Sequence, residues 1–473
     1  MAVSLCSLLF GGDNRVVAQS KRNDSVAVKG REKADTLTRG GKEDPLHPYP
    51  RLAQADIWVF AGQSNSQGWA LLKEPVQPDP RILLFDPERG WVLAEEPLNK
   101  NFSRWTPGPV NQNVLLQRFN ILPPSGTEAT TVLHDNQGAQ GGVGPALFFA
   151  KHLLKYVDRP IGLISCGVGS PISKWNPALK DRGTKSLYRN MLNQVAAAGG
   201  EIKGIVWYQG ESDALTAGAA DDYERAFLNL VDSIRRDTAS PELPFIYVQI
   251  GRFSHPYRDH ARNWEKIREV QRRVAVQRKH MHMVSAVDLV LEDSIHLGFE
   301  GYQRLGPRLA EIALTKVYRR PGHATPIDLE SIEILQPENR RPMIRVRFSG
   351  VNGRLTSAGR PTGFSLRTQR PSDDPSRFYP QPPVSDHPLH SIYRVDIDPT
   401  DPSAVILGVF DNSPILLGKP HVLTEPLSLI YGGGLDPYVN IIDEKDIPLP
   451  AFGPVEFRLP KPRSRNSNEE KTK

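Results

Sequence analysis

Short apolar runs alternate with amphipathic stretches through the middle of the chain. The first run, residues 56–61, is ended by Gly62 and has the continuous apolar character of a strand buried on both faces of a parallel sheet. Similar β-branched runs predict further strands at 161–165, 204–208, 245–250 and 283–287. Apolar residues at helical spacing predict helices at 145–157, 186–198, 222–236, 263–278 and 301–317. The alternation predicts an α/β domain over residues 55–322, with a parallel sheet between helical layers in a three-layer, flavodoxin-like arrangement.

Two segments break this alternation. Residues 75–130 are rich in Pro, Asn and Gln and predict a long insertion, either close to a functional pocket or a plain surface excursion. Beyond about Gly322, short alternating runs such as 343–348 and 404–410 are separated by Gly, Pro and Asp turns. We expect a smaller, antiparallel all-β domain over residues 323–459.

The ends of the chain differ from its body in charge and pattern. The chain carries 59 basic and 53 acidic side chains, but residues 56–459 hold 45 of each, so the excess positive charge lies at the ends. A neutral body lacks the basic surface that nucleic acids require, and we expect no nucleic-acid partner. Residues 19–54 and 460–473 are polar, without periodicity, and predict a disordered linker and tail.

Residues 1–18 contain a short apolar run followed by small residues, which is the pattern of a signal peptide without its basic start. The alternative is a disordered leader; on balance we expect export to the periplasm or the extracellular space. No other segment approaches the roughly 20 apolar residues of a transmembrane helix, so we expect no membrane span. With only two cysteines, Cys166 is expected to be a lone thiol at a buried strand end.

A serine at the end of the first strand is the main chemical signal. Ser64 follows Gly62, whose freedom permits a tight turn, and the carboxyl ends of parallel strands are where α/β folds bind ligands. The nucleophile elbow of α/β-hydrolases would need glycine at position 66, where the chain has Ser66. A serine hydroxyl also needs a base, and Asp293 lies three residues before His296 beyond the last predicted strand. Taken alone, such an Asp–His spacing is usually coincidence or a helix-entry feature.

Two further strand ends carry groups that can stabilise an oxyanion. Gln209 follows the strand at 204–208, and the glycine-rich turn at 166–170 follows the strand at 161–165. Each alone reads as an ordinary βα turn. Together with Ser64 and His296, they would bring a nucleophile, oxyanion donors and an acid–base pair to one edge of the sheet.

Successive motifs of this region resemble one enzyme family. The segments 57–65 (IWVFAGQSN), 144–147 (GPAL), 162–169 (GLISCGVG), 207–213 (WYQGESD) and 293–306 (DSIHLGFEGYQRLG) look like the blocks of the sialate O-acetylesterase-like branch of the SGNH hydrolases, which includes an acetylxylan esterase family. The likeness spans roughly residues 55–320 and keeps the blocks in order. It implies a serine esterase that removes O-acetyl groups from carbohydrates through an acyl-enzyme, with no metal or other cofactor.

The resemblance also implies residue roles. Ser64 is the nucleophile, His296 the general base and Asp293 its orienting carboxylate, while the Ser64 amide, Gly169 and Gln209 form the oxyanion hole. The chain departs from the pattern where Ser170 replaces a second glycine, which leaves Gly167 as an alternative donor.

Other residues near these motifs are candidates for substrate binding: Gln63, Asn65, Trp175 and Glu211. Glu211 could instead orient Gln209 or cap the following helix, and Trp175 could instead belong to the core. The histidines of segment 255–260 lack the partners and spacing of a metal site. The rival functions are a non-catalytic carbohydrate-binding scaffold and a general short-chain carboxylesterase.

Overall fold

The computed structural model describes residues 55–87, 89–98, 142–199, 202–255, 260–335, 343–368, 390–411 and 427–457. The expected leader at 1–18, the linker at 19–54 and the tail at 460–473 lie outside these residues. Most of the expected insertion also lies outside them. The described chain divides into two compact units, residues 1–212 with 229–243, and residues 213–228 with 244–473.

The first unit holds five strands of the α/β sheet, in the order β3-β2-β4-β1-β5. β1, β2, β4 and β5 run parallel, and β3 runs antiparallel along β2. Their bounds are β1 (Asp56–Gly62), β2 (Ile82–Asp86), β3 (Gly90–Leu93), β4 (Ile161–Gly167) and β5 (Ile202–Tyr208). The hairpin of β2 and β3 falls inside the expected insertion, so part of that segment extends the sheet at its edge.

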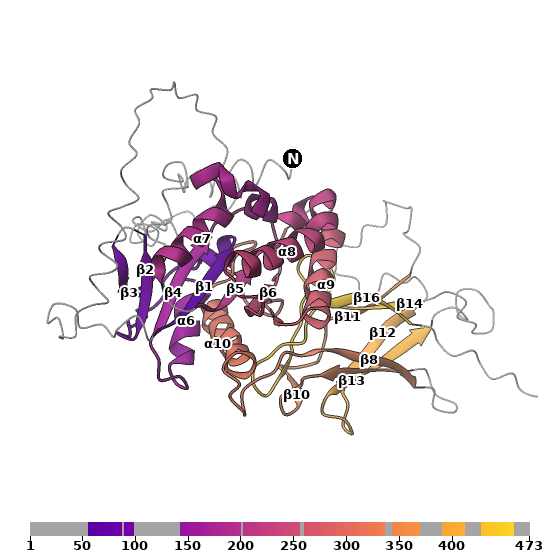
Figure 1. The fold of residues 1–473 in the computed structure, drawn as a ribbon. Helices are drawn as coiled ribbons and strands as arrows, with labels where there is room; N and C mark the ends of the chain where they lie inside the picture. Colours follow the sequence, from indigo (N-terminus) through magenta and orange to yellow (C-terminus); the bar gives the residue numbers. More distant parts are fainter. Residues whose placement is uncertain are drawn as a thin grey trace, which may run out of the picture. The chain divides into compact units, whose positions relative to one another are not determined.

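Helices cover this sheet on both faces. Figure 1 shows α6 and α7 on opposite sides of β1 and β4. Pro145 begins α6 at a position where a missing N–H is tolerated. The helix packs on β1 through Phe149, whose ring meets those of Trp58 and Phe60 edge-on, with centroids 4.9 and 5.3 Å apart. Ser186 caps α7 by accepting a hydrogen bond from the Arg189 amide. The helical elements here are α3 (Ser64–Gln67), α6 (Pro145–Leu153), η3 (Ile172–Trp175), η4 (Pro177–Lys185) and α7 (Leu187–Ala198), while α8 (Ala217–Asp237) contributes residues to both units.

The second unit combines the last α/β elements with the C-terminal strands. β6 and β7 are parallel, and α9 and α10 both contact them. The bounds are η5 (Asp213–Leu215), β6 (Phe245–Gln249), α9 (Ala261–Gln277), β7 (Met281–Ser285) and α10 (Phe299–Lys316). The described residues thus hold an α/β sheet, as expected, with seven strands instead of the five that the pattern predicted, and Cys166 is buried near the end of β4. None of the helices in the described part of the chain is both long and apolar enough to cross a bilayer.

The region beyond Gly322 is all β in its described residues, as the alternating pattern predicted. Its strands pair antiparallel in three sheets, β12-β13-β9-β8, β11-β14-β16 and β10-β15. Their bounds are β8 (Asp328–Leu335), β9 (Met343–Ser349), β10 (Leu355–Ser357), β11 (Phe364–Thr368), β12 (His390–Ile397), β13 (Ala404–Asp411), β14 (Leu427–Tyr431), β15 (Ile441–Asp443) and β16 (Phe452–Phe457). Within the sheet β11-β14-β16 the rings of Phe364 and Phe452 pack against Tyr431, and Phe452 also meets Phe348 of β9, with ring centroids 6.2 Å apart.

Candidate active site

Ser64 lies just beyond β1, at the start of the short helix α3. Gly62 has a φ of 135°, and a Cβ there would lie 2.1 Å from the carbonyl oxygen of Tyr208, so only glycine fits this turn. The neighbours Gln63 and Asn65 are buried, whereas Ser64 is partly exposed. The turn therefore leaves its serine accessible while its flanks are held inside the protein.

The register of three strands sets the surroundings of Ser64. Gly62 pairs with Gly167 at the end of β4 and with Tyr208 at the end of β5. Because these strands are parallel, the segments that follow them leave from the same edge of the sheet. Ser64, Gly169 and Gln209 are thus carried by three turns at one edge of the first unit.

Buried hydrogen bonds connect two of these turns. The Gln63 side-chain oxygen accepts bonds from the amides of Gly210 and Ser212, at 3.3 and 3.2 Å. The side-chain amide of Asn65 donates from Nδ2 to Glu211 Oε1 at 2.8 Å. Gln63, Asn65 and Glu211 are each at most 3% exposed. The structure therefore places these candidate sugar-binding residues between the turns that carry Ser64 and Gln209, which favours a role in holding the turns.

The third turn is joined to Gln209. The fully buried Gln209 side chain donates from Nε2 to the carbonyl oxygen of Ser170 at 3.4 Å. A Cβ on Gly167 would lie 2.4 Å from the Gln67 amide nitrogen, so close packing against α3 already explains glycine at that position. Gly169 is partly exposed, beyond the end of β4. These contacts favour Gly169 over Gly167 as the backbone donor to an oxyanion.

Trp175 belongs to the core of the first unit. Its side chain is 1% exposed and its ring packs edge-on against Trp207, with centroids 5.2 Å apart. This burial favours the core-packing alternative over stacking on a sugar ring.

Asp293 and His296 form a compact pair in the second unit, in the loop between β7 and α10. His296 Nδ1 lies 2.7 Å from Asp293 Oδ2. The other carboxylate oxygen, Oδ1, accepts bonds from the backbone amides of Ile295 and His296, both at 2.8 Å. The loop is closed by a bond from the Glu292 amide to the His296 carbonyl at 2.8 Å. Both carboxylate oxygens are therefore engaged, and the imidazole is fixed by its Nδ1 side.

The electrostatics of this pair favour a charged carboxylate. Burial raises the pKa of Asp293, but the hydrogen bond and charge of His296 and the bonds from the two backbone amides lower it by more, so the pKa of Asp293 lies below its ordinary value. Asp293 is consequently ionised at neutral pH, as a residue that stabilises an imidazolium must be.

Sequence reasoning missed two arginines at the turn after β6, Arg252 and Arg268. Arg268 is 1% exposed and lies on the buried face of α9 beside Trp264 and Gln271. A charged residue at a core position of an amphipathic helix was the available signal. Arg252, after β6, donates to the carbonyl oxygen of Leu289 at 3.5 Å, close to the start of the loop.

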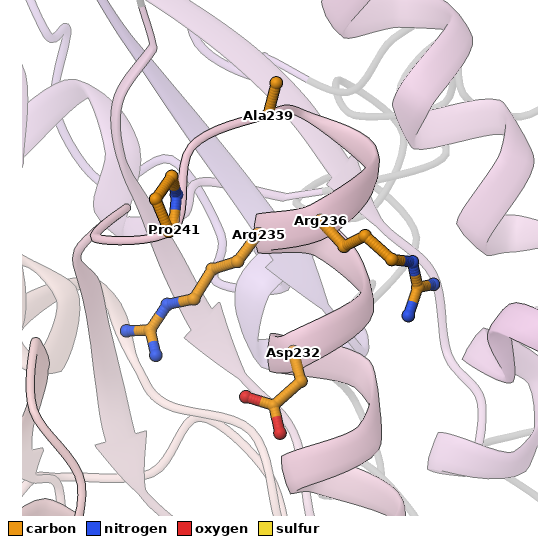
Figure 2. A pocket seen from close by; sticks show the side chains of 5 residues that line it. All are labelled: Asp232, Arg235, Arg236, Ala239 and Pro241. Carbon is orange, nitrogen blue, oxygen red and sulfur yellow. The ribbon is translucent and has the colours of Figure 1, made fainter.

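A surface hollow of about 380 Å³ lies elsewhere, at the end of α8. Figure 2 shows its lining, formed by Asp232, Arg235, Arg236, Ala239 and Pro241. Arg235 donates to the carbonyl oxygen of Leu243 at 3.2 and 3.1 Å, so it supports the chain after the helix. None of the residues predicted for catalysis lines this hollow, and we assign it no part in the reaction.

Comparisons with known proteins identify the family. Residues 54–315 match the family model described as carbohydrate esterase, sialic acid-specific acetylesterase. A probable carbohydrate esterase of Arabidopsis thaliana is 35% identical over 303 residues, which cover 58% of this chain and 98% of the plant protein. The crystal structure of a carbohydrate acetylesterase from Xanthomonas citri is similar in fold, with a TM-score of 0.55 and 21% identity over 84% of this chain and 80% of that one. The chain therefore belongs to the sialic acid-specific acetylesterase family of carbohydrate esterases and is a carboxylic ester hydrolase.

Proposed function

We propose that the protein removes O-acetyl groups from carbohydrates by way of an acetyl-enzyme on Ser64. The observation that carries this proposal is the 2.7 Å contact between His296 Nδ1 and Asp293 Oδ2, which sets an imidazole up as a general base. Family membership supports the substrate class. The accessible serine at the end of β1 supports the choice of nucleophile.

In this mechanism Ser64 Oγ attacks the acetyl carbonyl carbon while His296 Nε2 takes its proton. The tetrahedral intermediate collapses, and the sugar oxygen leaves with the proton from His296. Water then attacks the acetyl-enzyme, gives a proton to His296, and acetate departs as Ser64 Oγ regains that proton. Asp293 stabilises the imidazolium in both halves of the reaction.

We propose that three donors stabilise the developing oxyanion by hydrogen bonds: the backbone amides of Ser64 and Gly169 and the side chain of Gln209. All three belong to turns at one edge of the first unit's sheet. The Gln209 side chain lies beside the glycine-rich turn, where its Nε2 donates to the Ser170 carbonyl oxygen at 3.4 Å, and side-chain amide N–H groups are donors of the kind that stabilise an oxyanion. Gln63, Asn65 and Glu211 join the turn of Ser64 to the turn of Gln209 in this proposal, as the bonds from the Gly210 amide to Gln63 and from the Asn65 side chain to Glu211 support.

Labelling with a fluorophosphonate, followed by peptide mapping, tests the nucleophile. The proposal expects one modified residue, Ser64. Acetate release over acetylated sialic acids, acetylated xylan and 4-nitrophenyl esters of increasing chain length tests the substrate class. Acetyl esters of sugars should be the best substrates; equal or faster cleavage of long acyl chains would favour a general carboxylesterase, and absence of labelling and turnover would favour a binding protein.

Replacing Gln209 by alanine is expected to lower kcat for 4-nitrophenyl acetate by about 100- to 1,000-fold, because one oxyanion donor is lost while the nucleophile and base are kept. Residual turnover above the uncatalysed rate should remain measurable. Gln194→Ala, at another buried glutamine of the same unit, is the matched control and should keep wild-type kcat. Wild-type kcat in Gln209→Ala would remove Gln209 from the oxyanion hole.

We also propose that the protein is exported, on the pattern of residues 1–18. Protein recovered from the periplasm or the medium should begin near residue 19 when its N-terminus is sequenced. Protein that stays in the cytoplasm with Met1 attached would contradict export.

A further inference from the structure

The turn after β6 touches both the Asp293–His296 loop and the C-terminal β region, all within the second unit. On one side, the Ser254 amide donates to the carbonyl oxygen of Ser294 at 2.7 Å. On the other side, the Phe253 amide donates to the carbonyl oxygen of Leu435 at 2.9 Å. Ser294 stands between Asp293 and His296, so the turn bonds directly to the loop that carries the proposed base.

Arg252 adds a second connection through the same turn. Its guanidinium forms an ion pair with Asp436 at 2.8 Å and donates to the carbonyl oxygen of Leu289 at 3.5 Å. Asp436 belongs to the C-terminal β region, and Leu289 lies after β7, at the beginning of the segment that leads to Asp293. One side chain thus joins the C-terminal region to the segment that leads to Asp293.

Arg268 fixes the spacing between the turn and the C-terminal segment. Its five N–H groups have five carbonyl partners, two on one segment and three on the other: Ile250 at 3.2 Å, Gly251 at 2.6 Å, Gly432 at 3.0 Å, Gly434 at 2.7 Å and Leu435 at 3.3 Å. A planar guanidinium with donors in fixed directions holds such a set of acceptors in one arrangement. The Glu265 carboxylate adds a bond from the Gly434 amide at 2.8 Å.

We propose that the C-terminal β region positions the Asp293–His296 loop through the turn after β6, with Arg252 and Asp436 as positioning residues. The inference rests on the proposed function, because it assigns this loop the general base. The family match ends at residue 315, so Asp436 comes from a part of the chain beyond it. The C-terminal region is accordingly part of the catalytic apparatus rather than a separate accessory module.

The test is a double-mutant cycle with Arg252→Ala and Asp436→Ala in the full chain. Each variant should lower kcat for 4-nitrophenyl acetate by about 10- to 100-fold, as small displacements of a catalytic group do, with KM within about twofold of wild type. The double variant should be no slower than the slower single variant, since both remove one contact. Arg252→Lys keeps a charge opposite Asp436 and should recover most of the loss in kcat.

Arg273→Ala is the matched control, because Arg273 forms a half-exposed ion pair with Glu224 at 2.6 Å between two helices. It should lose as little thermal stability as Arg252→Ala and keep wild-type kcat. Wild-type kcat in both Arg252→Ala and Asp436→Ala, or a rise in KM alone, overturns the inference. Absence of fluorophosphonate labelling in the wild-type protein overturns the proposed function instead, so the two failures are distinguishable.

Discussion

Ser64→Ala is expected to lower kcat/KM for 4-nitrophenyl acetate by about 10⁴- to 10⁶-fold, because no other group in the proposed site can form the acetyl-enzyme. The remaining turnover should come from the oxyanion donors and from substrate binding, and it should stay above the uncatalysed rate. Fluorophosphonate labelling should disappear together with the activity. The measurement is initial rates with the purified variant, made alongside its circular dichroism spectrum to establish folding.

Ser66→Ala is the matched control for this change. Ser66 lies two residues further along α3 and is 2% exposed, so its replacement removes a hydroxyl from the same short helix without touching the proposed nucleophile. It should retain wild-type kcat and label normally. Full activity in Ser64→Ala, or equal losses in the two variants, would remove Ser64 from the mechanism and leave the esterase activity with another nucleophile.

The arrangement of the nucleophile turn was largely predictable, because it depends on local pattern and strand direction. An apolar run ending in glycine predicted β1, and parallel strands must present their carboxyl ends at one edge. The observed pairing of Gly62 with Gly167 and Tyr208 agrees with that geometry, since all three lie at the ends of their strands. The hairpin of β2 and β3 was not predicted, because its strands lie in a segment whose Pro and Asn content indicated an insertion.

The long-range polar contacts were not predictable from the chain pattern. The sequence makes Gln63 and Asn65 candidates for substrate binding, and it does not show that both are buried with bonds to the turn after β5. Arg268 meets carbonyl groups more than 160 positions away in the sequence. Hydrophobic periodicity reports which face of an element is buried, and it carries no information on which polar group across the fold accepts a given N–H.

Asp293→Asn is expected to lower kcat by about 10⁴-fold while leaving the fold and the KM for 4-nitrophenyl acetate nearly unchanged. An amide is close in shape to the carboxylate, so the bonds from the Ile295 and His296 amides can be kept. What is lost is the negative charge that stabilises the imidazolium and the acceptor that fixes its tautomer at Nδ1. The measurement is the pH dependence of kcat for wild type and variant.

The direction of the pKa shift of Asp293 determines how the pH dependences of kcat for wild type and Asp293→Asn should compare. A carboxyl whose pKa is lowered in the folded state contributes stability that is present above its ordinary pKa and is lost as pH falls through the lowered value. The carboxylate is therefore charged from about pH 5 upward, and the loss of kcat in Asp293→Asn should persist through that range, neutral pH included. Glu292→Gln removes the adjacent carboxylate and should keep wild-type kcat at every pH. A defect in Asp293→Asn that vanishes at neutral pH, or one shared by Glu292→Gln, would show that the loop works through its overall charge rather than through the Asp293–His296 bond.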